Sequence, residues 1–457
     1  MSGLARWIRT SSVVAVAAVP PAFAGAQGST GTILPGVKAG GSQNLKVLAH
    51  IPLGGFFRAG DLTVEQEASR PYAYVGQMLD RAGFAILDLR NPGQARVIYR
   101  WAIPGAAAHR GLGGVRPRYF KSAGRYFLVQ GFQFTAGSPD DDLAAIVFDV
   151  TGLPDTSRVR EVARIRVGGA RGGVRDLFAY KHSDGRALLF LATGEPRAPV
   201  YDLDAVVASK GAVAPVAAVP IPDAARVGGA PGYNAVTAAL EASTNRDVFY
   251  GAGAGGYYVY DVTDLRQPRL LTSVVGASGV VNGTSIAPSP DGRFVVTGTD
   301  YQYSPMRLFD LSEGLAGKAP TISRTTGAWT PDWHDASRRA EVRWPFVFVA
   351  SYEDGLEVFN MVNPANPQTV GWYFTCLCAH ESGLDPETLK PGNSVMNGAL
   401  GVDVRNSDGL VAVSDANSGF WLLRMEGFGG WNGNDWGVPN VSSAQDWDRA
   451  TPRRFVP

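Results

Sequence analysis

Pairs of short hydrophobic segments recur along the chain, and the two members of each pair are separated by a tight polar turn that contains glycine. The second member ends in an aromatic or aliphatic residue, then Asp or Asn, then another aliphatic residue. The clearest copies are 72–75 with 83–89, 248–251 with 256–262, 347–350 with 355–361, and 411–413 with 419–423. Short β-rich runs joined by such turns are typical of antiparallel hairpins.

The end of the second segment aligns at seven places, which are positions 88, 149, 202, 261, 310, 360 and 424. This period of roughly 50 to 65 residues is too long for a leucine-rich or ankyrin repeat and suits a propeller blade with variable loops. A further strand with partial alternation follows several copies, at 95–103, 159–167 and 269–275. Helical periodicity is nearly absent. The pattern predicts an all-β, seven-bladed β-propeller with four-stranded antiparallel blades.

The seventh copy has no fourth strand after it, because the sequence that follows is rich in glycine. Residues 44–52 have the composition of an outer strand and precede the first complete blade. We therefore expect this N-terminal strand to complete the last blade and close the ring. The propeller is predicted over 44–428, with a C-terminal extension over 429–457 packed on it through its tryptophans.

An aspartate ends the second segment in five of the copies, at Asp88, Asp149, Asp202, Asp261 and Asp310. An Asp at the start of a turn accepts hydrogen bonds from the backbone two residues further on. We interpret these five residues as turn formers and not as catalytic groups.

The unit Gly-x-x-Val/Ile-x-Asp-Val/Leu, followed by Asn-Pro and an apolar strand, resembles the LVIVD repeat of bacterial surface propellers. The match is good at 83–92, 256–268 and 355–367, whereas the copies that end at 202 and 310 depart from it. The resemblance implies a propeller in an extracytoplasmic setting. It implies no reaction, because a propeller hosts many unrelated functions.

The N-terminus has the pattern of a secretory signal peptide, with Arg6 and Arg9 before an apolar run at 13–19 and small residues around 22–24. The apolar run is shorter than the ~20 residues needed to span a bilayer. We predict a signal peptide over 1–26, a flexible segment over 27–43 and no integral membrane span in the mature chain. Export to the periplasm, the cell surface or the medium follows from this prediction.

The charge balance is nearly neutral, with 42 Lys and Arg against 41 Asp and Glu. A nucleic-acid-binding protein usually carries a basic surface, so this class is disfavoured. The chain has only two cysteines, which excludes a disulfide-rich scaffold.

Three of the five histidines, His109, His334 and His380, fall between the outer strand of one blade and the inner strand of the next. In a propeller these connections gather on one face around the channel, and imidazole is a favoured metal ligand. The same connections contain Trp333, Asp335 and Glu381, which we predict to belong to a binding face.

Cys376, Cys378 and His380 alternate along one segment, so an extended backbone would place both thiols and the imidazole on one side. This set suits Zn or Cu. The alternative is a disulfide between Cys376 and Cys378, which an oxidising compartment favours. Calcium is a further candidate cofactor, at the acidic turns 140–142 and 415–419.

Two functions remain open at this point. The absence of any complete catalytic constellation favours a binding or scaffold module for a protein or glycan at the cell envelope. The alternative is a metal-dependent, oxidoreductase-like propeller enzyme with a His-lined site at the end of the central channel, by analogy of fold alone.

Overall fold

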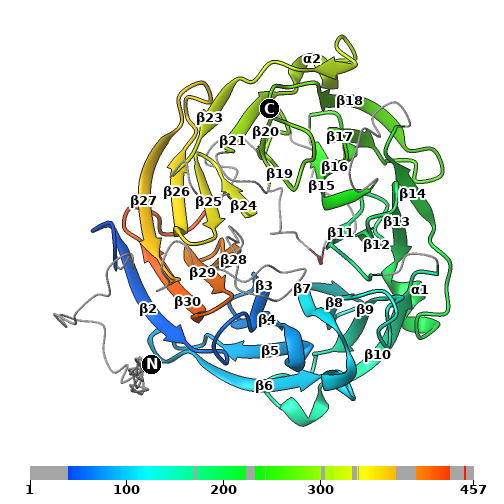
Figure 1. Cartoon of the computed structure of the whole chain (residues 1–457), viewed down its shortest axis with the longest axis vertical. Coiled ribbons are helices and arrows are strands. Elements are labelled where there is room, and N and C mark those ends of the chain that lie inside the picture. The colour runs from blue at the N-terminus through cyan, green and yellow to red at the C-terminus, as the bar shows by residue number, and fades with distance from the viewer. Residues whose placement is uncertain are drawn as a thin grey trace, which may run out of the picture. The chain divides into compact units, whose positions relative to one another are not determined.

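Seven small sheets follow one another around a ring, and in all but the last the main strands lie close together along the chain (Figure 1). The computed structural model describes residues 40–168, 172–222, 232–241, 243–299, 304–331, 337, 339–376, 398–432 and 447–448. Within each sheet the four main strands are antiparallel, from the inner edge at the channel to the outer rim. The predicted seven-bladed propeller with four-stranded blades is therefore confirmed.

Blades 1 to 4 contain sixteen of the strands. Blade 1 consists of β3 (Ala59–Val64), β4 (Tyr72–Gln77), β5 (Gly83–Asp88) and β6 (Arg96–Ala102). Blade 2 consists of β7 (Gly111–Ser122), β8 (Arg125–Phe134), β9 (Leu143–Asp149) and β10 (Arg160–Arg166). Blade 3 consists of β11 (Asp176–Lys181), β12 (Ala187–Ala192), β13 (Arg197–Asp202) and β14 (Ala217–Pro220). Blade 4 consists of β15 (Tyr233–Glu241), β16 (Arg246–Gly253), β17 (Gly256–Asp261) and β18 (Arg269–Val275).

Blades 5 to 7 complete the ring. Blade 5 consists of β19 (Ser285–Pro288), β20 (Phe294–Gly298), β21 (Met306–Asp310) and β23 (Gly327–Trp329), and β22 (Thr321–Ile322) pairs in parallel with β18 of blade 4. Blade 6 consists of β24 (Arg339–Arg343), β25 (Phe346–Ser351), β26 (Gly355–Asn360) and β27 (Gln368–Phe374). Blade 7 consists of β28 (Ala399–Val404), β29 (Leu410–Asp415), β30 (Gly419–Met425) and β2 (Leu45–Ile51).

The core lies between the blades, because each sheet packs on its two neighbours. Every residue of β5 and of β12 is buried, whereas the outer strand β6 is half-buried or exposed along its length. Phe84 of blade 1 meets Phe148 of blade 2 edge to face, with ring centroids 4.8 Å apart. This explains why the middle strands read as continuous hydrophobic runs and only the outer strands alternate.

The N-terminal strand closes the ring. β2 pairs with β30 along its whole length, from Leu45 opposite Met425 to Ile51 opposite Phe420, and lies beside it in Figure 1. The chain before it also pairs with blade 6, because β1 (Gly40–Gly41) adds to the edge of β27. The segment predicted as flexible thus ends in a strand, and the N-terminal part of the described chain ties blade 6 to blade 7.

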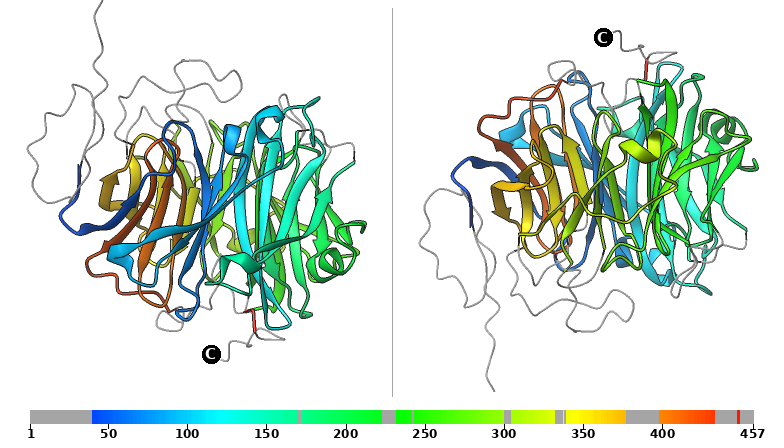
Figure 2. Two further views of the ribbon diagram at one scale, coloured as in Figure 1. Left: turned by 90° about the horizontal axis from the view of Figure 1, so that it is seen from below. Right: turned by 90° about the horizontal axis from the view of Figure 1, so that it is seen from above.

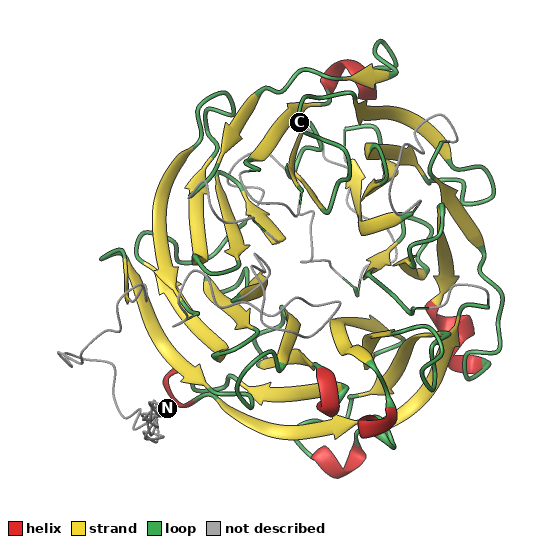
Figure 3. Ribbon diagram, in the orientation of Figure 1, coloured by secondary structure: helices red, strands yellow, loops and turns green. Residues whose placement is uncertain are grey.

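Helices are few and short, and they lie in the connections between strands (Figure 3). The described helices are η1 (Leu79–Arg81), η2 (Pro92–Gln94), η3 (Ala106–Ala108), η4 (Thr156–Arg158), α1 (Leu203–Ala208) and α2 (Ser312–Leu315). α1 and α2 follow the two repeat copies that depart from the motif, and they replace the Asn-Pro turn there. None of the helices in the described part of the chain is long and apolar enough to cross a membrane.

The repeated aspartates form turns, as predicted. In each of the five copies the carboxylate accepts a hydrogen bond from the backbone N–H two residues on, at Arg90, Thr151, Asp204, Thr263 and Ser312. Asn360 accepts the equivalent bond from Val362 in blade 6. Asp202 also accepts from Ala205 N–H and caps the first turn of α1.

We expect Asp149→Ala to lower the free energy of unfolding by about 1 kcal/mol at pH 7, since Arg125 and Arg160 are exposed partners. Burial of Asp149 raises the pKa of its carboxyl group. The hydrogen bonds from Arg125 and Thr151 outweigh this effect and lower the pKa from 3.8 to about 2. A depressed pKa stabilises the fold above pH ~4, and this contribution is lost as the pH falls towards 2. Urea unfolding of both proteins at pH 7 and pH 3 measures the effect. If the free energies of unfolding of the two proteins differ by the same amount at pH 7 and at pH 3, the ionised carboxylate is not the source of the stabilisation.

Candidate functional site

The connections between blades define one face of the ring, here called the mouth face. Because the strands of a blade are antiparallel, the outer-to-inner connections and the turns between second and third strands end at the same side. Figure 2 shows the blades edge-on, with loops at the two ends of the strands. Among the described residues this face contains Phe57, Met78, His109, Tyr352 and Cys376.

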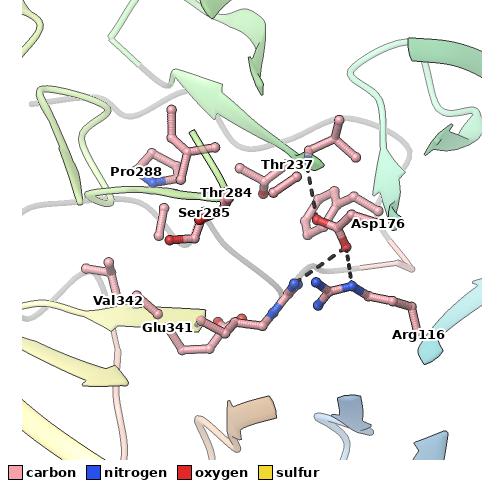
Figure 4. Close-up of a pocket in the computed structure, with 15 residues that line it drawn as sticks. Arg116, Asp176, Thr237, Thr284, Ser285, Pro288, Glu341 and Val342 are labelled. Carbon is pink, nitrogen blue, oxygen red and sulfur yellow. Dashed lines mark hydrogen bonds and ion pairs between the residues drawn. The ribbon is translucent and has the colours of Figure 1, made fainter. Parts of the chain in front are cut away.

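An ion-pair network crosses the channel below the mouth face. Arg116 of β7 donates from Nη1 to Asp61 Oδ2 at 2.5 Å and from Nε to Arg175 O at 3.3 Å. It also forms an ion pair with Asp176, with Nε 2.9 Å from Oδ1 (Figure 4). Arg339 of β24 reaches the same two carboxylates from the other side of the ring, at 3.5 Å each. The four side chains come from the inner strands of blades 1, 2, 3 and 6, and they connect these blades through the channel.

The inner-strand aspartates also join neighbouring blades through the backbone. Asp176 Oδ1 accepts from Leu177 N–H in its own strand, and Oδ2 accepts from Val236 N–H in blade 4 at 3.0 Å. Asp403 makes the same pair of bonds, to Val404 N–H and to Val64 N–H of blade 1. Each of these carboxylates therefore joins two neighbouring inner strands by hydrogen bonds to the backbone of both.

Burial changes the acidity of these groups. Desolvation raises the pKa of Asp176, against the effect of Arg116 and Arg118. Desolvation and then the charge of Glu341 raise the pKa of Asp403 to about 6. The negative charge at these positions therefore depends on the guanidinium groups beside it.

A small polar cavity lies in the channel beside this network (Figure 4). Its lining includes Arg116, Asp176, Arg339, Ser285 and Glu341. Its volume of about 40 Å³ is enough for a few water molecules. Ser285 Oγ is buried and has no hydrogen-bond partner among the described residues, which fits a hydrated cavity.

A second pocket, here called the mouth pocket, opens on the mouth face over Arg116. Its apolar wall comes from blades 1, 2, 6 and 7 and consists of Phe57, Met78, Leu112, Val115, Tyr352 and Leu400. Its polar lining consists of Asp61, Arg116, Gln133 and Arg175. The pocket has a volume of about 80 Å³, against about 40 Å³ for the channel cavity. A largely apolar hollow with a few convergent polar groups is typical of a ligand site.

His109 fastens two loops of blade 2 to each other. Its Nε2 lies 3.1 Å from Asp140 Oδ2, its Nδ1 lies 3.1 Å from Gly105 O, and its ring packs on Phe134. Both ring nitrogens thus have protein partners, and a metal would have to displace one of them. Of the other predicted ligands and binding-face residues, His334, His380, Cys378, Trp333, Asp335 and Glu381 lie outside the described residues.

Cys376 is disulfide-bonded, and the chain contains one further cysteine, Cys378. In this oxidised state Cys376 has no thiolate to offer to a metal. Its segment packs on the last turn of blade 7: Thr375 donates to Asp415 Oδ2 at 2.8 Å, and Asn417 Nδ2 lies 3.7 Å from Cys376 Sγ. Within the described ranges, no group of three or more His, Cys, Asp or Glu side chains is placed to hold a metal ion.

The two acidic turns considered for calcium are occupied by protein groups. Asp140 pairs with Arg166 as well as with His109, and Asp142 pairs with Arg166 too. Asp415 Oδ1 accepts from the N–H groups of Asn417 and Ser418, which makes this segment a hairpin turn.

No protein-family model and no curated protein matches the chain. The resemblance to LVIVD propellers therefore depends on the motif residues alone, and the case for function depends on the geometry of the mouth face.

Sequence reasoning did not identify the channel residues Asp61, Arg116, Asp176 and Arg339. A signal for two of them exists, since Asp-Leu occurs at 61–62 and 176–177 and Asp-Val at 403–404, each time shortly before the second strand of a blade. The arginines follow no such spacing.

Proposed function

We propose that the protein is an exported propeller that binds another protein, or a glycan, in the mouth pocket. The observation that carries this proposal is the apolar hollow on the mouth face, closed below by Asp61 and Arg116. The pocket combines residues of the connections, namely Phe57, Met78, Arg175 and Tyr352, with residues of the strands β3, β7, β8 and β28, so a rigid scaffold holds it.

The lining favours a protein partner over a glycan. Its wall is aliphatic and aromatic, with Met78, Leu112 and Leu400 forming a surface suited to an apolar side chain. Phe56 extends the apolar surface beside it and is 45% exposed. No tryptophan belongs to the lining of the pocket, which therefore has no indole ring on which a sugar could stack.

The export part of the proposal is supported by the signal-like N-terminus and by the resemblance to LVIVD propellers. A fusion of residues 1–40 to a reporter that is active only outside the cytoplasm tests it. Reporter activity is expected with this segment and not with a version in which the apolar run 13–19 is replaced by Ser and Asn.

The binding part is tested by a double substitution, Leu112→Lys with Leu400→Lys, since both side chains are half-buried at the rim of the pocket. We expect the double variant to capture at least tenfold less of a protein partner than the unaltered protein when both are cross-linked in the exported fraction. The melting temperature of the variant should be unchanged. Leu270→Lys, on the outer rim of blade 4, is the matched control and should capture normally. Equal capture by both variants would contradict the proposal, and a panel of glycans covers the alternative ligand class.

A further inference from the structure

We propose that the mouth pocket takes up one uncharged aliphatic side chain of a protein partner, of about the size of Leu, and that Gln133 binds the partner's main chain beside it. This inference rests on the proposed function and names the group that enters the pocket. It draws on the charge balance of the lining, on the volume of the pocket and on the amide of Gln133.

The charged groups of the lining are paired with their protein neighbours. Arg116 forms ion pairs with Asp61 and Asp176 and donates from Nε to Arg175 O. Arg175 donates from Nη1 to Asn234 Oδ1 at 2.5 Å. A charged group of a ligand would have to compete with these contacts in a poorly solvated site. An uncharged group leaves them intact, so the lining favours a neutral ligand.

The wall of the pocket is a continuous apolar surface from three blades. Phe57, Met78 and Val115 belong to one buried cluster, and Leu112 and Leu400 pack against it. The two leucines are half-buried and form the rim. An aliphatic side chain that enters between these residues exchanges water for apolar contacts, which is the main source of affinity for such a group.

The volume of the pocket limits the side chain that fits. It is about 80 Å³, whereas an apolar cavity that binds benzene has about 150 Å³. An aromatic ring is therefore disfavoured, and the side chains of Val, Leu, Ile and Met fit better. The network of Asp61, Arg116, Asp176 and Arg339 crosses the channel beneath the pocket. A side chain thus enters from the mouth face while its main chain stays outside.

Gln133 of β8 contributes an uncharged polar group to the lining. Its side chain is half-buried and makes no hydrogen bond to any residue in the described part of the chain. A primary amide has both donors and an acceptor, as a peptide group does. Gln133 can therefore pair with a peptide group of the partner while the adjacent aliphatic side chain occupies the hollow. This pairing adds no charge to the site.

The first test needs no knowledge of the natural partner. Short random peptides displayed on a carrier protein are selected on the immobilised chain from residue 27 onward, and the selected sequences are compared. We expect enrichment of Val, Leu, Ile or Met at one shared position. The same selection on the Leu112→Lys, Leu400→Lys variant should give no such enrichment, because two charged side chains then stand at the rim.

The size and charge of the anchor are tested on the best peptide, labelled with fluorescein and measured by fluorescence anisotropy. Replacing the aliphatic anchor by Asp or by Trp should weaken binding by about tenfold or more. Asp brings a charge to a lining whose own charges are paired, and Trp is larger than the hollow. These comparisons use the unaltered protein.

Variants of the protein locate the site. Leu400→Ala widens the rim and should shift the preference from the Leu-anchored towards the Phe-anchored peptide, a change of selectivity that a loss of stability would not produce. Gln133→Leu should weaken both peptides about tenfold, because the bond to the main chain is lost whichever anchor is present. Gln267→Leu, in the exposed turn after β17, is the matched control and should bind normally.

Three results would overturn the inference: no shared position among the selected peptides, a charged residue or Trp at that position, or an unchanged preference in the Leu400→Ala variant. If one of them is found while the Leu112→Lys, Leu400→Lys variant still loses its cross-linked partner, only this inference fails and the proposed function stands. If that variant captures its partner normally, the proposed function fails as well.

Discussion

Deleting residues 1–53, and with them β1 and β2, is expected to abolish cooperative folding or to lower the free energy of unfolding by about 5 kcal/mol or more. β30 would lose its partner strand β2, and the buried Phe420 and Met425 would lose the cover that Ile51 and Leu45 provide. Blade 7 would then be connected to blade 1 by side-chain packing and by hydrogen bonds such as those of Asp403 and Gln66. Urea unfolding followed by tryptophan fluorescence measures the effect.

A chain that lacks only residues 1–39 keeps both strands and is the control, with an expected unchanged urea midpoint. A synthetic peptide of residues 40–53, added to the shorter protein, should restore the transition, because the missing strand can pair in trans. If the chain without residues 1–53 unfolds at the midpoint of the control, closure of the ring by β2 contributes nothing and this interpretation is wrong.

Asp176→Ala is expected to be the most destabilising of the single substitutions considered, at about 3 to 5 kcal/mol. The change removes a carboxylate that binds Arg116, Arg339 and Val236 N–H, and it leaves Asp61 as the carboxylate that the two arginines share. Arg116 is 4% exposed, so the loss of one of its two ionic partners is felt in a poorly solvated site. Chemical unfolding at pH 7 measures the difference.

Asp264→Ala is the matched control, since Asp264 forms an exposed pair with Arg266 and its removal should leave the urea midpoint unchanged. The double variant Asp176→Ala, Arg116→Ala should be less destabilised than the sum of the two single changes. Comparable losses at Asp176 and Asp264 would show that the channel network does not hold the blades together.

The hairpin units were predictable because they are local. The turn aspartates such as Asp149 and Asp261 bind backbone two residues away, so their role depends only on neighbours in the sequence. The pairing of β2 with β30 was also predictable, since the last repeat lacks a strand and residues 44–52 have no other blade to join.

The channel and the mouth pocket were not predictable in the same way. Asp61, Arg116 and Arg339 belong to three blades, and nothing in their spacing shows that ring closure brings them together. The surroundings of His109 were likewise not predictable from its position in the sequence. Its position between blades suggested a metal ligand, but its ring nitrogens lie against Gly105 and Asp140 of its own blade and the connection leading into it.

The sequence by itself therefore determined the blade, the number of blades, the turns that shape them and the strand that closes the ring. These features arise from side-chain alternation and from hydrogen bonds between residues close along the chain. Only the tertiary structure decided where charge and apolar surface converge, because the mouth pocket is lined by residues of five blades, from Phe57 to Leu400, that are up to 343 positions apart. Such proximity is a property of the closed ring, and no local pattern encodes it.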